Sequence, residues 1–308
     1  MKTISCFSYK GGAGRSTLAL NVVPFLVEKL NATPDQPLIL VDLDVDSCGL
    51  TFLFDLANKP RIATMNVQHL FGKGGSIPQA EEDEDIHDHS VLSGLFPVGE
   101  FFGFEDKAIV CLPARPQARL SETENGNYDY SDKNFADFVR VCRDYDCAGI
   151  LFDAPVGGQC TANWANQYAS HIMCVMRPTQ QFRKGTDRFF DDYDRTNARG
   201  QNIIVIPNVV PTDELTIKGK DENGQEEIRS YPNYAKEDIQ KIFSDNIERH
   251  NNRYNMELVT GDVFGIPKVD RFMWQEGVLR NVPRTELNEH ERLALKQYEK
   301  VAEIISRD

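Results

Sequence analysis

The feature that most constrains the fold of this chain lies within its first seventeen residues. The apolar run Ile4-Ser-Cys-Phe-Ser-Tyr leads into the glycine-rich segment Lys10-Gly-Gly-Ala-Gly-Arg-Ser-Thr17, and an apolar-periodic segment follows from Leu18 to Leu30. This order predicts a strand, a tight turn and a helix. Glycines let successive backbone N–H groups point into one concavity, and the start of the helix adds its positive dipole. The sequence therefore predicts a loop that binds a polyphosphate.

Further apolar runs recur along the chain with helical stretches between them. The six expected strands are Thr3–Ser8, Pro37–Asp42, Ala108–Pro113, Ala148–Asp153, His171–Met176 and Asn202–Pro207. Several are continuously apolar, which is typical of strands buried on both faces. Strands that alternate with helices predict an α/β fold with a doubly wound, mostly parallel sheet flanked by helices. Ligands of such sheets bind at the carboxyl ends of the strands.

Composition places the chain among globular proteins and argues against some partners. Residues are 41% hydrophobic and 26% charged, and the formal net charge of −13 does not favour a broad DNA-binding face. No apolar run approaches the roughly 20 residues that cross a bilayer, and the N-terminal segment reads as a core strand rather than a signal peptide. The seven cysteines show no CxxC spacing, and Cys6, Cys111 and Cys174 fall in expected strands. We therefore expect buried thiols in a cytoplasmic protein.

Two segments read as insertions in one domain that spans residues 1–308. The first, near 79–90, contains the acidic run EEDEDIHD at Glu81–Asp88, which we expect to be a solvated loop. The second, near 212–254, contains two strand-like runs on either side of Asp221-Glu-Asn-Gly224 and then a helical pattern near Lys236–Arg249. It predicts a β-hairpin followed by a helix.

Polar side chains follow the apolar runs at the ends where a ligand is expected. Asp42, Asp44 and Asp46 close the second run, Asp153 closes the fourth and is followed by Ala-Pro-Val-Gly-Gly158, and Asn208 follows the sixth. Carboxylates in such places can hold a magnesium-bound water or orient a water that attacks a γ-phosphate. An asparagine amide can both donate to and accept from a purine edge.

Taken in order, these motifs resemble the ParA/MinD ATPases. The string KGGAGRST resembles the deviant phosphate loop of that family (KGGxGK[ST]), VDLDVD its second motif and LFDAPVGG its third. The resemblance continues through residues 109–120, 171–180, 206–211 and 263–274 and leaves out the two insertions. It implies the P-loop NTPase fold, ATP or ADP with Mg2+ as cofactors, a monomer without nucleotide or with ADP, a homodimer with ATP, and a protein partner that stimulates hydrolysis.

The resemblance also implies a role for individual residues. Lys10 matches the signature lysine that reaches the phosphates of the partner chain, and Asp44 matches the acidic residue that positions the attacking water. Ser16 matches the hydroxyl ligand of magnesium, with Asp42 and Asp153 near the magnesium shell. Asn208 matches the residue that recognises adenine, and Pro267 lies in the loop that covers the base. The loop residues expected to surround the phosphates are Lys10, Gly11, Gly12, Ala13, Gly14, Arg15, Ser16 and Thr17.

The chain departs from the family pattern at Arg15, which stands where the phosphate-binding lysine is expected. Arginine keeps the positive charge and can contact a phosphate through two N–H groups, but its planar fork is bulkier than an ammonium. Slow hydrolysis, normal activity in a reshaped loop and nucleotide binding alone are all compatible with this change. Because Lys10, Ser16, Asp44 and Asp153 remain, we favour an ATPase with slow hydrolysis, and we count Arg15 among its catalytic residues.

The sequence carries weaker signals about whether the protein acts on a membrane, on DNA or on a protein partner. The tail from Glu289 to Asp308 is a mixed-charge helical pattern, which favours a core-packing helix over a basic membrane anchor. The basic residues that could serve DNA binding read as ordinary surface charge; they are Arg183, Lys184, Arg188, Lys268 and Arg271. We expect a nucleotide-dependent homodimer and a protein partner, with the 212–254 insertion as the added contact surface.

Three other functions fit the same fold. A non-hydrolysing scaffold would use bound nucleotide only to set its shape, and ATP turnover separates it from an ATPase. A bacterial tyrosine kinase would carry a tyrosine-rich tail, whereas this tail has only Tyr298. An iron–sulfur reductase would need cysteines able to bridge a dimer, and only Cys160 stands near a motif.

Overall fold

The structure of the chain is a computed structural model, and side chains are described except at 192–196, 216–220 and 226–230. The described residues are 1–78, 91–116, 130–196, 200–211, 216–220, 225–230, 236–237, 239–245, 255–260, 264–273 and 276–307.

An eight-stranded sheet forms the centre of the fold. Its strand order is β10-β7-β6-β1-β5-β2-β4-β3, and every pairing is parallel except that of β3 with β4. The strands in chain order are β1 (Lys2–Phe7), β2 (Leu38–Asp42), β3 (Phe96–Pro97), β4 (Ile109–Leu112), β5 (Gly149–Asp153), β6 (His171–Met176), β7 (Asn202–Pro207) and β10 (Asn255–Leu258). Six of the eight match the strands expected from the sequence. The short strand β3 and strand β10, which lie at the two edges of the sheet, were not expected.

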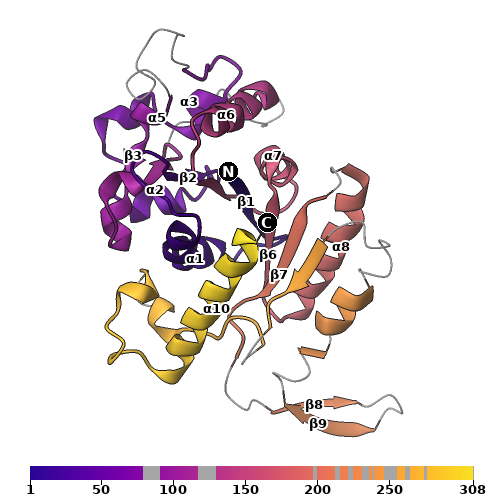
Figure 1. The fold of residues 1–308 in the computed structure, drawn as a ribbon. Helices are drawn as coiled ribbons and strands as arrows, with labels where there is room; N and C mark the ends of the chain where they lie inside the picture. Colours follow the sequence, from indigo (N-terminus) through magenta and orange to yellow (C-terminus); the bar gives the residue numbers. More distant parts are fainter. Residues whose placement is uncertain are drawn as a thin grey trace.

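Helices cover both faces of this sheet (Figure 1). Helices α1 (Arg15–Lys29) and α10 (Glu289–Ser306) pack together on one face, and α6 (Asp132–Asp144), α7 (Cys160–Tyr168) and α8 (Gln180–Thr196) lie on the other. Three short helices lie near the β2–β4 side of the sheet: α2 (Gly49–Leu53), α3 (Val67–Phe71) and α5 (Val91–Gly94). The α/β fold with a doubly wound, mostly parallel sheet is therefore confirmed.

The core follows from the apolar pattern of the strands. All residues of β2, β4, β5 and β6 are buried, as expected when helices cover both faces of a parallel sheet. The thiols of Cys6, Cys111 and Cys174 lie in this core, which confirms the expectation of buried cysteines in the strands.

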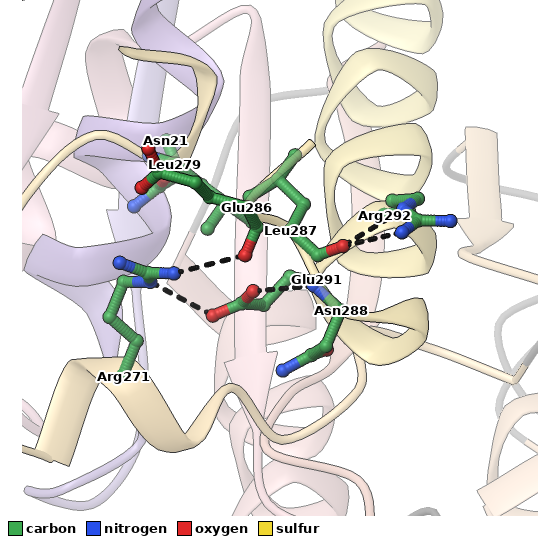
Figure 2. Close-up of polar contacts among 8 residues, drawn as sticks. All are labelled: Asn21, Arg271, Leu279, Glu286, Leu287, Asn288, Glu291 and Arg292. Atoms are coloured by element: carbon green, nitrogen blue, oxygen red, sulfur yellow. Dashed lines mark hydrogen bonds and ion pairs between the residues drawn. The ribbon is translucent and has the colours of Figure 1, made fainter. Parts of the chain in front are cut away.

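Helix α10 packs into the core and does not present an apolar face to solvent. Its buried apolar residues are Ala294, Tyr298, Val301, Ala302, Ile304 and Ile305. Figure 2 shows the start of this helix, where the Asn288 side chain and Glu291 close a capping box, and the Arg271 guanidinium donates to Glu291 Oε1 at 2.9 Å. The core-packing tail helix is confirmed. In the described part of the chain, no helix has the length and apolarity required to span a bilayer.

The second insertion contains the expected hairpin. Strands β8 (Thr216–Lys220) and β9 (Glu226–Ser230) pair antiparallel, with Thr216 opposite Ser230, and form a separate two-stranded sheet that stands away from the main sheet (Figure 1). Its expected Asn-Gly turn lies outside the described residues. The described residues at 236–237 and 239–245 are helical, in agreement with the helix expected near Lys236–Arg249. The acidic segment near 79–90 lies outside the described residues.

Candidate phosphate-binding site

The glycine-rich segment forms a tight turn between β1 and α1. Gly12 and Gly14 have left-handed backbones, with φ of 80° and 84°. Helix α1 begins at Arg15, immediately after Gly14, and no side chain caps it. The first N–H groups of a helix have no partner within the helix, so an uncapped start offers several donors and a positive dipole to an anion.

Gly14 is the position where the loop requires glycine most strongly. Besides its left-handed φ, a Cβ at Gly14 would stand 2.7 Å from Nδ2 of Asn208. That amide donates to the carbonyl oxygen of Ala13 at 2.9 Å and lies 3.4 Å from that of Gly14. Asn208, at the end of β7, therefore holds the turn from outside.

Lys10 is exposed at the mouth of the loop. Its ammonium donates to Oε1 of Gln181 in the first turn of α8. The carbonyl of Lys10 accepts a hydrogen bond of 2.8 Å from the hydroxyl of the buried Ser8. The loop thus fixes the backbone of Lys10 while its side chain reaches outward.

Arg15 points into the site and joins two of the predicted motifs. One guanidinium nitrogen, Nη1, donates to the hydroxyl of Ser8 at 2.9 Å, and Nη2 donates to Oδ2 of Asp44 at 3.2 Å. Only 10% of the Arg15 side chain and 18% of the Asp44 side chain are exposed. The third nitrogen, Nε, is buried and has no hydrogen-bond partner.

Asp42 and Asp153 lie side by side because β2 and β5 are neighbours in register. The Ser16 hydroxyl donates to Oδ2 of Asp153 at 2.6 Å. Thr51, in α2, donates to Oδ2 of Asp42 through its backbone N–H at 3.0 Å and its hydroxyl at 2.8 Å. The other oxygen of each carboxyl group, Oδ1, is buried and without a partner.

The two carboxyl groups share an environment that resists their ionisation. Burial, and then the charge of Asp153, raise the pKa of Asp42 to about 7. Burial raises the pKa of Asp153 to about 6, although the hydrogen bond from Ser16 and the charge of Arg15 act against it. Two neighbouring buried carboxylates repel each other, so a cation close to them would favour the charged form of both.

These residues fit a magnesium ion. Mg2+ prefers oxygen ligands, and in phosphate-binding sites it uses one or two carboxylates together with waters and phosphate oxygens. Asp42, Asp153 and the hydroxyl of Ser16 supply such a set, and two buried carboxyl oxygens there have no partner in the protein. Across the described residues, no group of three or more His, Cys, Asp or Glu side chains is placed to hold a metal by itself.

The segments expected to enclose a base lie together. Val210 pairs with Pro267 in a parallel bridge, the Val210 N–H donates to the carbonyl of Ile266 at 3.0 Å, and the Lys268 N–H donates to the carbonyl of Val210 at 2.8 Å. Pro267 is buried. Asn208 and Pro267 therefore belong to one pair of adjacent segments beside the phosphate loop.

The structure thus brings together the predicted motifs at the carboxyl ends of β1, β2, β5 and β7. It adds three residues that the sequence did not single out: Ser8, Thr51 and Gln181. Ser8 stands at the strand end next to the loop, which is a signal that could have identified it. Thr51 and Gln181 come from helices, and no spacing connects them to the motifs.

Several of the basic side chains considered for DNA contact are engaged within the chain. Arg183 is buried, with 8% of the residue exposed, so the expectation that it is ordinary surface charge is wrong. Lys268 pairs with Asp270 at 2.7 Å, and Arg271 pairs with Glu291 at 2.9 Å. Cys160, considered for an iron–sulfur cluster, is an exposed free thiol at the start of α7.

Solved structures with a similar fold match nearly the whole chain. The septum site-determining protein MinD of Pyrococcus horikoshii, complexed with Mg-ADP, has 18% identity and a TM-score of 0.56 over 98% of this chain and 96% of that chain. Apo McdA of Cyanthece has 11% identity and a TM-score of 0.62 over 99% of both chains. The pNOB8 ParA protein bound to nonspecific DNA has 12% identity and a TM-score of 0.52 over 99% of this chain and 97% of that chain.

Sequence comparisons add nothing to this likeness. No family model matches the chain, and no curated protein matches its sequence. At identities of 11–18% the similarity is one of fold. The fold implied by the sequence resemblance is confirmed: the chain has the fold of the ParA/MinD ATPases.

Proposed function

We propose that the protein is an ATPase of the ParA/MinD family that binds ATP with Mg2+ at the glycine-rich loop. The observation that carries this proposal is the pair of buried carboxyl groups, Asp42 and Asp153, each with one oxygen that has no partner in the protein. They lie beside the Ser16 hydroxyl and the uncapped start of α1. Buried polar atoms are almost always satisfied in proteins, so two unsatisfied carboxyl oxygens beside an uncapped helix start support a ligand site.

Each residue would then have a specific role. The loop backbone from Gly11 to Thr17 would bind the phosphates, with Lys10 and Arg15 supplying positive charge. Ser16, Asp42 and Asp153 would hold Mg2+, which when bound neutralises charge on the phosphate oxygens. Asp44 would orient the attacking water. Asn208 and Pro267 would contact the adenine, and the contact of Asn208 with the loop carbonyls would link base binding to the shape of the loop.

Hydrolysis at this site would be slow. Without nucleotide, the guanidinium of Arg15 contacts Asp44, the residue proposed to orient water, so this contact must break before Asp44 can act. A non-hydrolysing scaffold is the second candidate, and persistence of the contact with nucleotide bound would favour it. Phosphate release by the wild type that does not exceed that of Asp44→Ala would favour the scaffold over the ATPase.

We also propose that ATP binding drives homodimerisation and that the dimer signals to a protein partner. The exposed position of Lys10 supports this part, because its ammonium can be reached by a second chain. The hairpin of β8 and β9 stands apart from the main sheet, and a two-stranded sheet has little stability on its own. Because an isolated hairpin gains stability by packing against another surface, its position supports the insertion at 212–254 as the contact surface for the partner.

Size-exclusion chromatography with light scattering tests the dimer. Wild type and Lys10→Ala should be compared without nucleotide, with ADP and with ATP. We expect the mass of the wild type to double only with ATP and the mass of Lys10→Ala to stay that of one chain. A mass that does not respond to nucleotide in either protein would contradict the switch.

A further inference from the structure

The ion pair between Arg15 and Asp44 has the geometry of a weak contact, which a stronger ligand of the guanidinium could replace. The two groups meet through one nitrogen and one oxygen at 3.2 Å, which is longer than the usual distance between a charged donor and a charged acceptor. The Arg15 Nε is buried without a partner. Asp44 therefore leaves part of the donor capacity of the guanidinium unused, and an anion with several oxygens could use more of it.

Asp44 is also held from its other side. Its Oδ1 accepts a hydrogen bond of 3.3 Å from the N–H of Ser47, and its carbonyl accepts one of 2.7 Å from the N–H of Cys48. If the guanidinium left Oδ2, these two bonds could still hold Asp44 in place. Oδ2 would then be free to accept a hydrogen bond from water.

We propose that Asp44 and the phosphate of a bound nucleotide compete for the guanidinium of Arg15. Phosphate binding moves Arg15 from the carboxylate to the phosphate and frees Oδ2 of Asp44. Arg15 is then both a phosphate-binding residue and a positioning residue that keeps Asp44 occupied until nucleotide is bound. This inference rests on the proposed function, because it assumes that the loop binds nucleotide.

The competition predicts that loss of Asp44 strengthens nucleotide binding. Since the carboxylate no longer holds the guanidinium, Asp44→Asn should bind Mg-ADP about fivefold more tightly than the wild type, which corresponds to about 1 kcal/mol. The gain should disappear in an Arg15→Gln background. Simple repulsion between Asp44 and the phosphate would instead give the same gain in both backgrounds. Asp46→Asn, which removes a charge two residues away, is the matched control and should show little gain.

Titration calorimetry with Mg-ADP on the wild type, the two single variants and the double variant gives this comparison. An equal gain from Asp44→Asn in both backgrounds would overturn the competition and leave the proposed function standing. Absence of Mg-ADP binding by the wild type would overturn both.

A second measurement decides the matter if Arg15→Gln binds too weakly for calorimetry. Urea unfolding of the same four proteins gives the coupling between Arg15 and Asp44 without any nucleotide. We expect favourable coupling in the nucleotide-free protein. Its absence would overturn the proposal whatever the binding data show.

Discussion

Helices α1 and α10 pack against each other but begin in different ways. Asn288 and Glu291 close the start of α10 with a capping box, and Arg271 adds an ion pair to Glu291 (Figure 2). The start of α1 has only the left-handed Gly14 and no side-chain cap. A capped start satisfies its own N–H groups, whereas an open one leaves them for a ligand. Under the proposed function, α1 is the functional helix of this pair and α10 the structural one.

The polar side chains beside the two helix starts also differ in how fully they are hydrogen-bonded. Beside α10, Glu291 uses its two carboxyl oxygens, one with Arg271 and one with the N–H of Asn288. Beside α1, Asp42, Asp153 and Arg15 each keep a buried polar atom without a partner. An unsatisfied buried polar group costs roughly 1–3 kcal/mol, so the protein is less stable at this site than it would be with every group paired.

The largest effect on nucleotide affinity should come from a side chain added at the uncapped start of α1. Gly14→Ala places a Cβ 2.7 Å from Asn208 Nδ2 and strains a left-handed backbone, so we expect nucleotide affinity to fall by roughly tenfold or more. Gly12→Ala is the matched control, because it strains a similar backbone with no atom within 4 Å of the new Cβ. Titration calorimetry measures both, and equal losses would show that the contact with Asn208 has no role.

The largest effect on stability concerns its pH dependence in the absence of nucleotide and magnesium. The pKa of Asp42 is about 7 in the folded protein against an ordinary value of 3.8, so its contribution to stability falls as the pH rises between these values. Asp42→Asn should therefore be more stable than the wild type by about 4 kcal/mol near pH 8 and should lose most of this advantage near pH 4. Urea unfolding across this pH range measures the difference. An advantage that does not change with pH would contradict the raised pKa.

The fold could be predicted from the sequence because its strands are buried on both faces. Short, continuous apolar runs such as Leu38–Asp42 and Gly149–Asp153 indicate buried strands. The polar residue at the end of each run indicates the edge of the sheet where a ligand binds. Strand β10 was missed because Asn255–Leu258 lies at a sheet edge, is only partly buried and has no such pattern.

The candidate site could be predicted in its residues but not in its contacts. The motifs place Arg15 after β1 and Asp44 after β2, the two strands on either side of β5. Their ion pair, however, depends on the side-chain conformation of an arginine where a lysine was expected. Thr51 holds Asp42 from a five-residue helix whose sequence carries no capping or spacing signal. Such contacts depend on tertiary structure and leave no periodic trace.

The smallest effect should come from removing the cap at the start of α10. Asn288→Ala removes the cap of α10 and should lower the free energy of unfolding by about 1 kcal/mol. Nucleotide affinity should not change, because the two hydrogen bonds of the cap join only Asn288 and Glu291. Thermal unfolding and calorimetry on the same protein measure both quantities. A loss of affinity similar to that of Gly14→Ala would break the division between a functional and a structural helix.

Titration calorimetry of ATP with and without Mg2+, on the wild type and on Ser16→Ala, tests the central claim most directly. We predict one nucleotide per chain, binding that Mg2+ strengthens in the wild type, and a much smaller effect of Mg2+ in Ser16→Ala. The absence of ATP binding by the wild type, or binding that neither Mg2+ nor the Ser16 substitution alters, would contradict the account.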